Sequence, residues 1–139
     1  MDWKACAVDD LRRYRHMKIG VLNSRDKLRM LSSQATSART TASRQCERTS
    51  PKLIDTIVET ERLKSNLDVA ENLVGLIERG LDSLSEEERV VLERFYISDL
   101  PKNMTHLKGE LGYEERSLYR LRDRALKKFT LAMYGVEMM

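Results

Sequence analysis

No stretch of this chain is apolar over enough residues to suggest a membrane span. A helix that crosses a bilayer needs about twenty consecutive, mainly apolar residues, whereas charged side chains interrupt every apolar segment here. The N-terminal stretch MDWKACAVDDLRRYRH also lacks the apolar core of a secretion signal. We therefore expect a protein that has no membrane partner and works in the cytoplasm.

Cysteine and histidine are scarce, with two residues of each. Cys6 and Cys46 stand alone, and His16 and His106 lie in different segments, so neither pair has the spacing of a metal site. The phosphate-binding patterns GxxxxGK[ST] and GxGxxG and the zinc-binding pattern HExxH do not occur. The three glutamates at 86–88 lie where a helix should begin, and a helix dipole favours acidic side chains there. We expect no metal, no cofactor and no enzymatic activity.

Glycine, proline and aromatic residues are also few, while charged residues make up 34% of the chain. This composition is typical of a helix-rich protein, because strands favour aromatic and β-branched residues. The sequence predicts an all-α fold in which a long helical arm or hairpin precedes a C-terminal helical domain. Four parts are expected along the chain: an N-terminal helix in residues 1–31, a linker at 32–50, a heptad-patterned helix at 51–84 and the C-terminal domain at 85–139.

The linker is expected because residues 32–50, SSQATSARTTASRQCERTS, contain no large aliphatic side chain. Such a segment buries too little apolar area to offset the entropy lost on ordering, so we expect it to be flexible. Ser50 is a good helix N-cap, and Pro51 suits the first helical position. A new helix should therefore begin at Pro51.

The heptad-patterned helix carries two apolar stripes. From residue 63 onward, apolar side chains alternate at spacings of four and three, the a/d pattern of helices that pack on one another. The main stripe, called the seam below, contains Leu63, Leu67, Val74, Ile77 and Leu81. The second stripe contains Ile54, Ile57, Val58, Val69, Leu73 and Leu76. One stripe should pack on the N-terminal helix and the other on a second subunit or the C-terminal domain, giving either an intramolecular hairpin or a homodimer.

A capping box marks the start of a helix expected at residues 86–97. Ser85 is placed to accept a hydrogen bond from the backbone of Glu88, whose carboxylate can reach back to residue 85. Apolar residues of this helix, among them Phe95 and Tyr96, recur at helical spacing and should face the core.

Residues 107–129, LKGELGYEERSLYRLRDRALKKF, predict two helices joined by a tight turn. Gly112 lies where the turn needs a residue that tolerates a positive φ. The second helix should run from about Glu114 to Tyr134 and end at Gly135. Its apolar stripe, expected in the core, comprises Leu118, Leu121, Ala125 and Phe129. Two such helices, the second one basic, form a helix-turn-helix, the shape that enters a DNA major groove.

Basic charge is concentrated on that second helix. The net charge of the chain is only +3, which by itself indicates no partner, but residues 116–128 hold six basic residues and one acid, Asp123. Clustered basic side chains on one helix face suit contacts with phosphates. The alternative is a solvated helix face whose Lys and Arg stems cover apolar neighbours.

The order of these motifs resembles region 4 of the sigma-70 family, and more closely the small phage regulators of the ArpU and RinA type. Residues in register include Glu88-Arg89, Leu111-Gly112 and Ala125-Leu126-Lys127-Lys128, and the resemblance covers roughly residues 81–135. It implies a sigma-region-4-like domain that binds double-stranded DNA and regulates, most often activates, phage late or packaging genes. It also implies a nucleoid-associated location in a bacterial host and host RNA polymerase as a second partner.

The resemblance assigns DNA contacts residue by residue. The implied contacts are Thr105, Glu115, Arg116, Ser117, Tyr119, Arg120, Arg124 and Lys127. Arg116 and Arg120 should read bases, because an arginine can bond guanine bidentately, and Ser117 should contact a base or a phosphate. The more distant Arg124 and Lys127 should contact phosphates, as should Thr105 near the start of the first helix.

One position departs from the family pattern. Where the first helix crosses the second, helix-turn-helix motifs usually have a small residue, but this chain has Lys108 followed by Gly109. Either Gly109 provides the close approach, or the two helices cross differently from the family.

Two other functions are compatible with the same sequence. A small terminase subunit that initiates DNA packaging can also join a helix-turn-helix to a helical oligomerisation segment. A helical adaptor could bind the transcription machinery without contacting DNA. Ring-sized oligomers would favour the terminase subunit, and indifference to charge reversal on the last helix would favour the adaptor.

Overall fold

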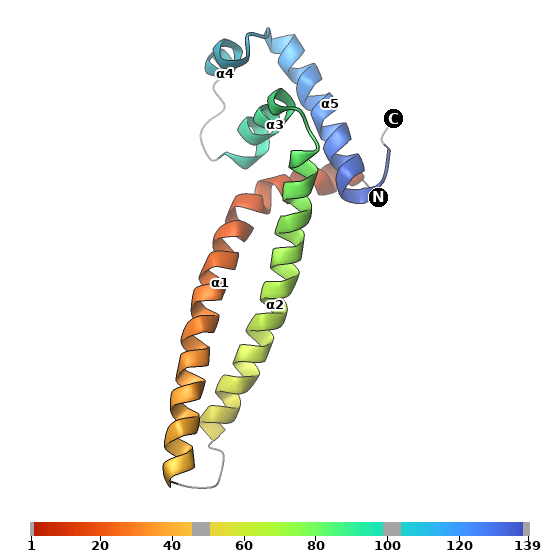
Figure 1. Ribbon diagram of the computed structural model, residues 1–139. Coiled ribbons are helices and arrows are strands. Elements are labelled where there is room, and N and C mark those ends of the chain that lie inside the picture. Colours follow the sequence, from red (N-terminus) through yellow and green to blue (C-terminus); the bar gives the residue numbers. More distant parts are fainter. Residues whose placement is uncertain (1, 46–50, 99–103, 138–139) are drawn as a thin grey trace. The chain divides into compact units, whose positions relative to one another are not determined.

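The computed structural model describes residues 2–45, 51–98 and 104–137 (Figure 1). Helices make up almost all of these residues and no strand occurs among them, which confirms the expected all-α fold. The elements are α1 (Trp3–Gln45), α2 (Pro51–Asp82), α3 (Glu86–Leu92), the π-helical turn η1 (Glu93–Ile97), α4 (Met104–Leu111) and α5 (Glu115–Tyr134). None of the helices in the described ranges is both long and apolar enough to cross a bilayer.

The first helix is longer than the sequence predicted. It continues to Gln45, so the expectation of a linker is wrong for residues 32–45. This stretch contains neither glycine nor proline, and extending an existing helix costs far less than nucleating one, so alanine, glutamine and arginine suffice to continue it. Residues 46–50, including the proposed N-cap Ser50, lie outside the described residues. Pro51 is the first residue of α2, as expected.

The chain divides into two compact units, which do not follow the expected boundary at residue 85. The hairpin unit consists of residues 17–73, and the C-terminal unit combines the described parts of 1–16 and 74–139. The seam is therefore shared, with Leu63 and Leu67 in the hairpin unit and the other three residues in the C-terminal unit. The early turns of α1 thus belong with α5, a long-range association that helical periodicity does not reveal.

In the hairpin unit, α1 and α2 pair through apolar and ionic contacts. Leu53 and Leu67 of α2 are buried, as are Val21 and Leu31 of α1. Two ion pairs bridge the helices, with 2.8 Å between Arg25 Nε and Glu71 Oε1 and 3.6 Å between Lys27 Nζ and Glu59 Oε1. Thr60 is also buried, and its hydroxyl donates to the carbonyl oxygen of Thr56 at 2.7 Å, so its polar atom is satisfied inside the pair.

The second stripe of α2 remains outside the core. Ile54, Val58 and Val69 are 50%, 53% and 67% exposed within the hairpin unit, and Leu76 is 43% exposed in the C-terminal unit. The exposed residues of this stripe lie roughly a third to half a turn around α2 from the seam, whereas Leu73, four residues before Ile77, borders the seam. The seam is buried or half-buried, and most of the second stripe is solvent-exposed.

The core of the C-terminal unit brings α3, η1, α4 and α5 together. Its buried residues are Val91, Phe95, Leu107, Leu118 and Leu121, and the partly buried residues against them are Tyr96, Met104 and Leu111. The expected core positions of the last helix are confirmed, because Leu118, Ala125 and Phe129 are fully buried and Leu121 is 4% exposed. The helix expected at 86–97 passes into the wider turn η1, in which the Ser98 amide donates to the carbonyl oxygen of Glu93 at 2.8 Å.

Gly80 allows α2 and α5 to approach each other closely in the C-terminal unit. A Cβ atom at this position would lie 2.9 Å from Cε2 of Phe129, a distance shorter than Cβ atoms show to their neighbours in real proteins. Phe129 is fully buried here. The cost of a mid-helix glycine, about 1 kcal/mol relative to alanine, is therefore offset by the burial of an aromatic ring.

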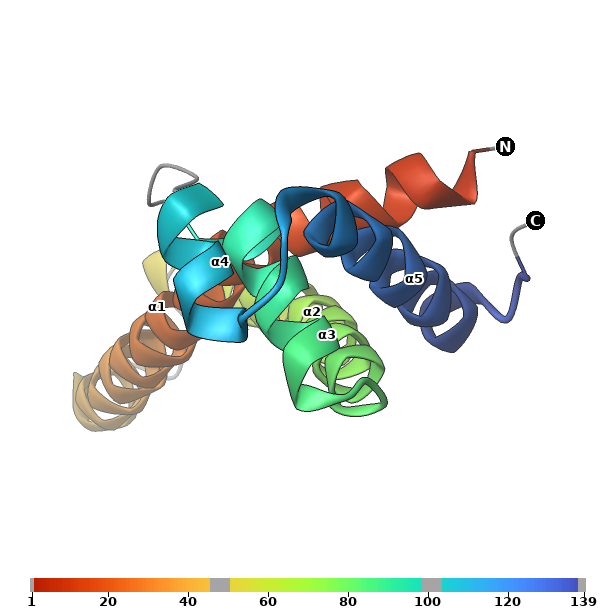
Figure 2. The same cartoon turned by 90° about the horizontal axis from the view of Figure 1, so that it is seen from above.

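The early turns of α1 lie beside the C-terminal end of α5, as both views show (Figures 1 and 2). The rings of Trp3 and Tyr134 have centroids 5.1 Å apart, and the Tyr134 hydroxyl donates a hydrogen bond to the Asp10 carboxylate. Burial of Tyr134 and this hydrogen bond raise the pKa of its phenol. Arg13, on the same helix as Asp10, pairs with that carboxylate at 3.1 Å, so the buried acid contacts one residue of α1 and one of α5.

Candidate nucleic-acid interface

The capping box at the start of α3 is formed as predicted. The Glu88 amide donates to Ser85 Oγ at 3.3 Å, and the Ser85 amide donates to Glu88 Oε1 at 3.1 Å. An N-cap of this kind contributes about 1 kcal/mol to helix stability. It fixes the first turn of α3, a helix against which α5 packs.

The Glu88 carboxylate also joins α3 to α5. The residue is only 3% exposed, and Lys128 Nζ lies 3.1 Å from its Oε2 and 3.2 Å from its Oε1. Burial alone would disfavour the charged carboxylate, but hydrogen bonds from Ser85 and Lys128 and the lysine charge outweigh it, so the pKa of Glu88 lies below its ordinary value. The ionised carboxylate is thus the form that holds α5 in place.

This lowered pKa predicts a loss of stability in acid. A depressed carboxyl pKa contributes stability that is fully present above the ordinary value of 4.5 and is lost as the pH falls through the folded-state value. Glu88→Gln should lower the free energy of unfolding by about 1–3 kcal/mol at neutral pH and flatten its decline in acid. Urea denaturation at a series of pH values measures both effects.

The matched control for this prediction is Glu86→Gln, because Glu86 is exposed on the same helical turn. That variant should keep the stability and pH dependence of the parent. If Glu88→Gln and Glu86→Gln gave the same pH profile, the buried ion pair would not be the source of the acid sensitivity.

The turn between α4 and α5 has the geometry that the sequence predicted. Gly112 has a φ of 74°, and its amide donates to the carbonyl oxygen of Lys108 at 2.7 Å. The Tyr113 hydroxyl donates to Glu87 Oε2 at 2.7 Å, and this hydrogen bond raises the pKa of the phenol. Glu114 is the extended N-cap residue, and α5 begins at Glu115, one residue later than expected.

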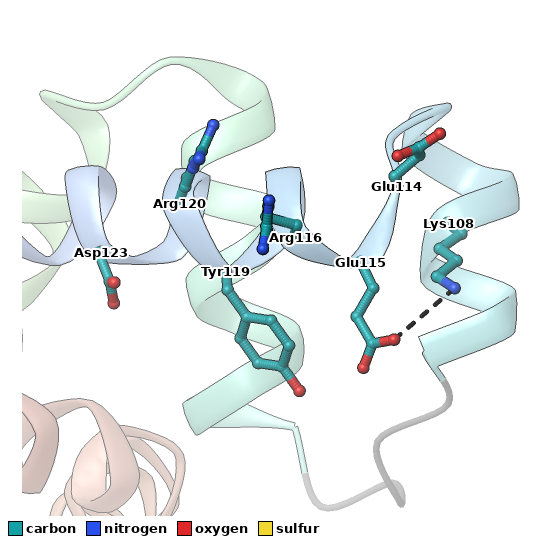
Figure 3. A pocket seen from close by; sticks show the side chains of 7 residues that line it. All are labelled: Lys108, Glu114, Glu115, Arg116, Tyr119, Arg120 and Asp123. Carbon is teal, nitrogen blue, oxygen red and sulfur yellow. Dashed lines mark ion pairs between the residues drawn. The ribbon is translucent and has the colours of Figure 1, made fainter.

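Gly109 does not provide the close approach considered for the helix crossing. A Cβ atom at this position would meet no atom within 4 Å among the described residues, and the residue is exposed. Lys108 instead reaches toward the start of α5, where its Nζ lies 3.9 Å from Glu115 Oε2 (Figure 3).

All eight residues assigned to DNA contact are exposed: Thr105, Glu115, Arg116, Ser117, Tyr119, Arg120, Arg124 and Lys127. A shallow concavity of about 750 Å³ lies over the first turns of α5 (Figure 3). Its lining residues are Lys108, Glu114, Glu115, Arg116, Tyr119, Arg120 and Asp123. Four of the eight assigned residues therefore share one surface, and the other four lie outside its lining.

The basic residues of α5 differ in whether they already have partners. Lys128 pairs with Glu88, and Arg124 Nε lies 3.9 Å from the same carboxylate. Arg122 is bound to Asp123, with 3.0 Å between its Nη2 and Oδ1. Within the described parts of the chain, the remaining three, Arg116, Arg120 and Lys127, form no ion pair. These three cations are therefore available to an external anion.

Several residues of this surface were not predicted from the sequence. Lys108, Glu114 and Asp123 line the concavity, and Arg122 stacks on Tyr119 with 5.0 Å from its Cζ to the ring centroid. The Arg122–Tyr119 contact has a local signal, because residues three apart on a helix are neighbours. The pairing of Glu88 with Lys128 has none, because forty positions separate them.

Across the described residues, no group of three or more His, Cys, Asp or Glu side chains is arranged to hold a metal ion. Comparison of the chain with protein-family models, curated proteins and solved structures gives no match.

Proposed function

We propose that this protein is a sequence-specific DNA-binding regulator of transcription that inserts α5 into the major groove. The observation that carries the proposal is the division of α5 into two opposite faces. Leu118 and Leu121 are buried in the core of the C-terminal unit, whereas Arg116 and Arg120 lie on the exposed side without an ion pair in the described residues.

The local geometry of α4 and α5 supports this proposal. A major groove about 12 Å wide admits one α-helix, and residues 112–117, from the glycine turn into the first turn of α5, are all exposed. Arginine side chains early in such a helix can bond guanine O6 and N7. Lys127, about two turns after Arg120, is suited to a phosphate.

The resemblance to phage regulators supplies the biological part of the proposal. It favours activation of late or packaging genes in a bacterial host, with RNA polymerase as a second partner. DNA fragments that co-purify with the protein from its host would identify the operator and hence the regulated genes. Recovery of a packaging-initiation site bound by a ring-sized oligomer would instead favour the terminase alternative.

Two substitutions separate base reading from phosphate contact. Arg120→Ala should cost about 1–3 kcal/mol of binding free energy on the cognate site and relax the preference at one base pair. Lys127→Ala should weaken binding to all duplexes about equally and reduce the salt slope by about one unit. Anisotropy titrations at several salt concentrations, with cognate and scrambled duplexes, distinguish the two results.

Arg94→Ala is a suitable control for these titrations. Arg94, on η1, pairs with Glu110 of α4 at 3.2 Å and does not line the concavity. Parent-like binding by Arg120→Ala and Lys127→Ala to both duplexes would contradict the proposal and favour an adaptor that does not contact DNA.

A further inference from the structure

We infer that Arg122 is a positioning residue for DNA recognition, which neutralises Asp123 and orients Tyr119 rather than contacting DNA itself. The inference depends on the proposed function, because it concerns the same surface. It begins from an electrostatic problem: Asp123 lines the concavity beside Arg120 and is half-exposed. An unpaired carboxylate there would repel the phosphates of a bound duplex.

Arg122 offsets most of the Asp123 charge by pairing with that carboxylate. Its Nε and Nη2 both donate to Asp123 Oδ1, at 3.2 and 3.0 Å. Consecutive residues on a helix do not normally face each other, so the arginine side chain must be held in an orientation that brings its guanidinium back to residue 123.

Two aromatic rings provide that orientation. The Arg122 Cζ atom lies 5.3 Å from the ring centroid of Phe95 and 5.0 Å from that of Tyr119. The two rings also meet edge to face, with their centroids 5.9 Å apart. Phe95 is buried in the core of the unit, whereas Tyr119 is 38% exposed at the concavity. The guanidinium therefore links the fixed core ring to the exposed ring.

This arrangement assigns a distinct role to each member. Phe95 provides the fixed support, Arg122 stacks on it and offsets the charge of Asp123, and Tyr119 is held in one orientation where it can contact a base or sugar. With its side chain only 26% exposed and two donors already used, Arg122 is poorly placed to bind a phosphate. The basic composition of α5 thus overstates the number of cations that DNA can engage.

The test is a double-mutant cycle in DNA binding with the full chain. Duplex selected from a random-sequence library by the parent protein is titrated with the parent, Arg122→Ala, Asp123→Asn and the double variant. At low salt, Arg122→Ala should bind about fivefold more weakly, because one carboxylate charge is exposed near the phosphates. The defect should shrink between about 50 and 200 mM salt as screening increases.

The decisive comparison is the double variant. If the effect passes through the Asp123 charge, Arg122→Ala with Asp123→Asn should bind within about twofold of Asp123→Asn alone. Arg122→Lys should recover part of the affinity, because it retains the charge but not the planar stacking. A double variant as weak as Arg122→Ala would overturn the inference, since the arginine would then act independently of Asp123.

Arg94→Ala is the matched control for arginine removal, and thermal melting identifies variants that bind weakly because they unfold. If Arg122→Ala weakened binding only because the protein unfolds, its melting temperature would fall and Asp123→Asn would not restore DNA affinity. If the parent binds DNA and Arg120→Ala weakens binding, but residues 122 and 123 are not coupled, only this inference fails. If the parent binds no selected duplex, the proposed function fails as well.

Discussion

Replacement of Phe129 by alanine should lower the free energy of unfolding by about 3–5 kcal/mol, the usual cost of deleting a buried aromatic ring. The ring is fully buried and lies against Gly80, which has no side chain that could move to fill the space. The loss should therefore include the cost of a cavity as well as the lost apolar contacts. Urea denaturation followed by far-ultraviolet circular dichroism measures this change.

Leu131→Ala is the matched control, since Leu131 lies on the same helix but is 47% exposed. It should change the free energy of unfolding by no more than about 0.5 kcal/mol. Similar small losses for Phe129→Ala and Leu131→Ala would show that the C-terminal unit does not depend on the Phe129–Gly80 contact.

The second large effect is expected at the seam. Ile77→Ala should cost about 2–5 kcal/mol, because the side chain is fully buried in the C-terminal unit. Val69→Ala, on the second stripe and 67% exposed, should stay within about 0.5 kcal/mol of the parent if the chain is monomeric. Denaturation midpoints of both variants at one protein concentration give the comparison.

Protein concentration makes this pair more informative. If copies associate through the second stripe, the Val69→Ala variant should melt at a lower temperature than the parent. Its melting temperature should also depend less on protein concentration than that of the parent. A chain that tolerates aspartate at position 77 without loss of stability would contradict the assignment of the seam to the core.

Local signals in the sequence predicted the fold where the interactions themselves are local. The Ser85–Glu88 capping box, the left-handed glycines at 112 and 135 and the helical start at Pro51 all depend on residues within one or two turns of each other. Each therefore follows from spacing and backbone preference without knowledge of the tertiary structure.

Interactions between distant segments explain most of what the sequence did not predict. Glu88 meets Lys128, and Tyr134 meets Asp10, because folding brings separate helices together. The prediction of a linker at 32–45 failed for a different reason. The scarcity of aliphatic residues there indicates that the segment contributes little to a core, but a helix can still continue through a segment that contains no glycine or proline. For the candidate site, exposure of the assigned residues followed from helical periodicity, whereas the neutralisation of Asp123 depended on side-chain orientation.

The two opposite faces of α5 also have a consequence for how this protein can change over time. Positions 116 and 120 are exposed, while the residues that hold the helix in place, Leu118 and Phe129, are fully buried. Under the proposed function, new operator preferences could arise by substitution at the exposed positions with little penalty in folding. If the proposed function holds, a library randomised at 116, 117 and 120 should therefore yield many well-folded members with altered DNA specificity.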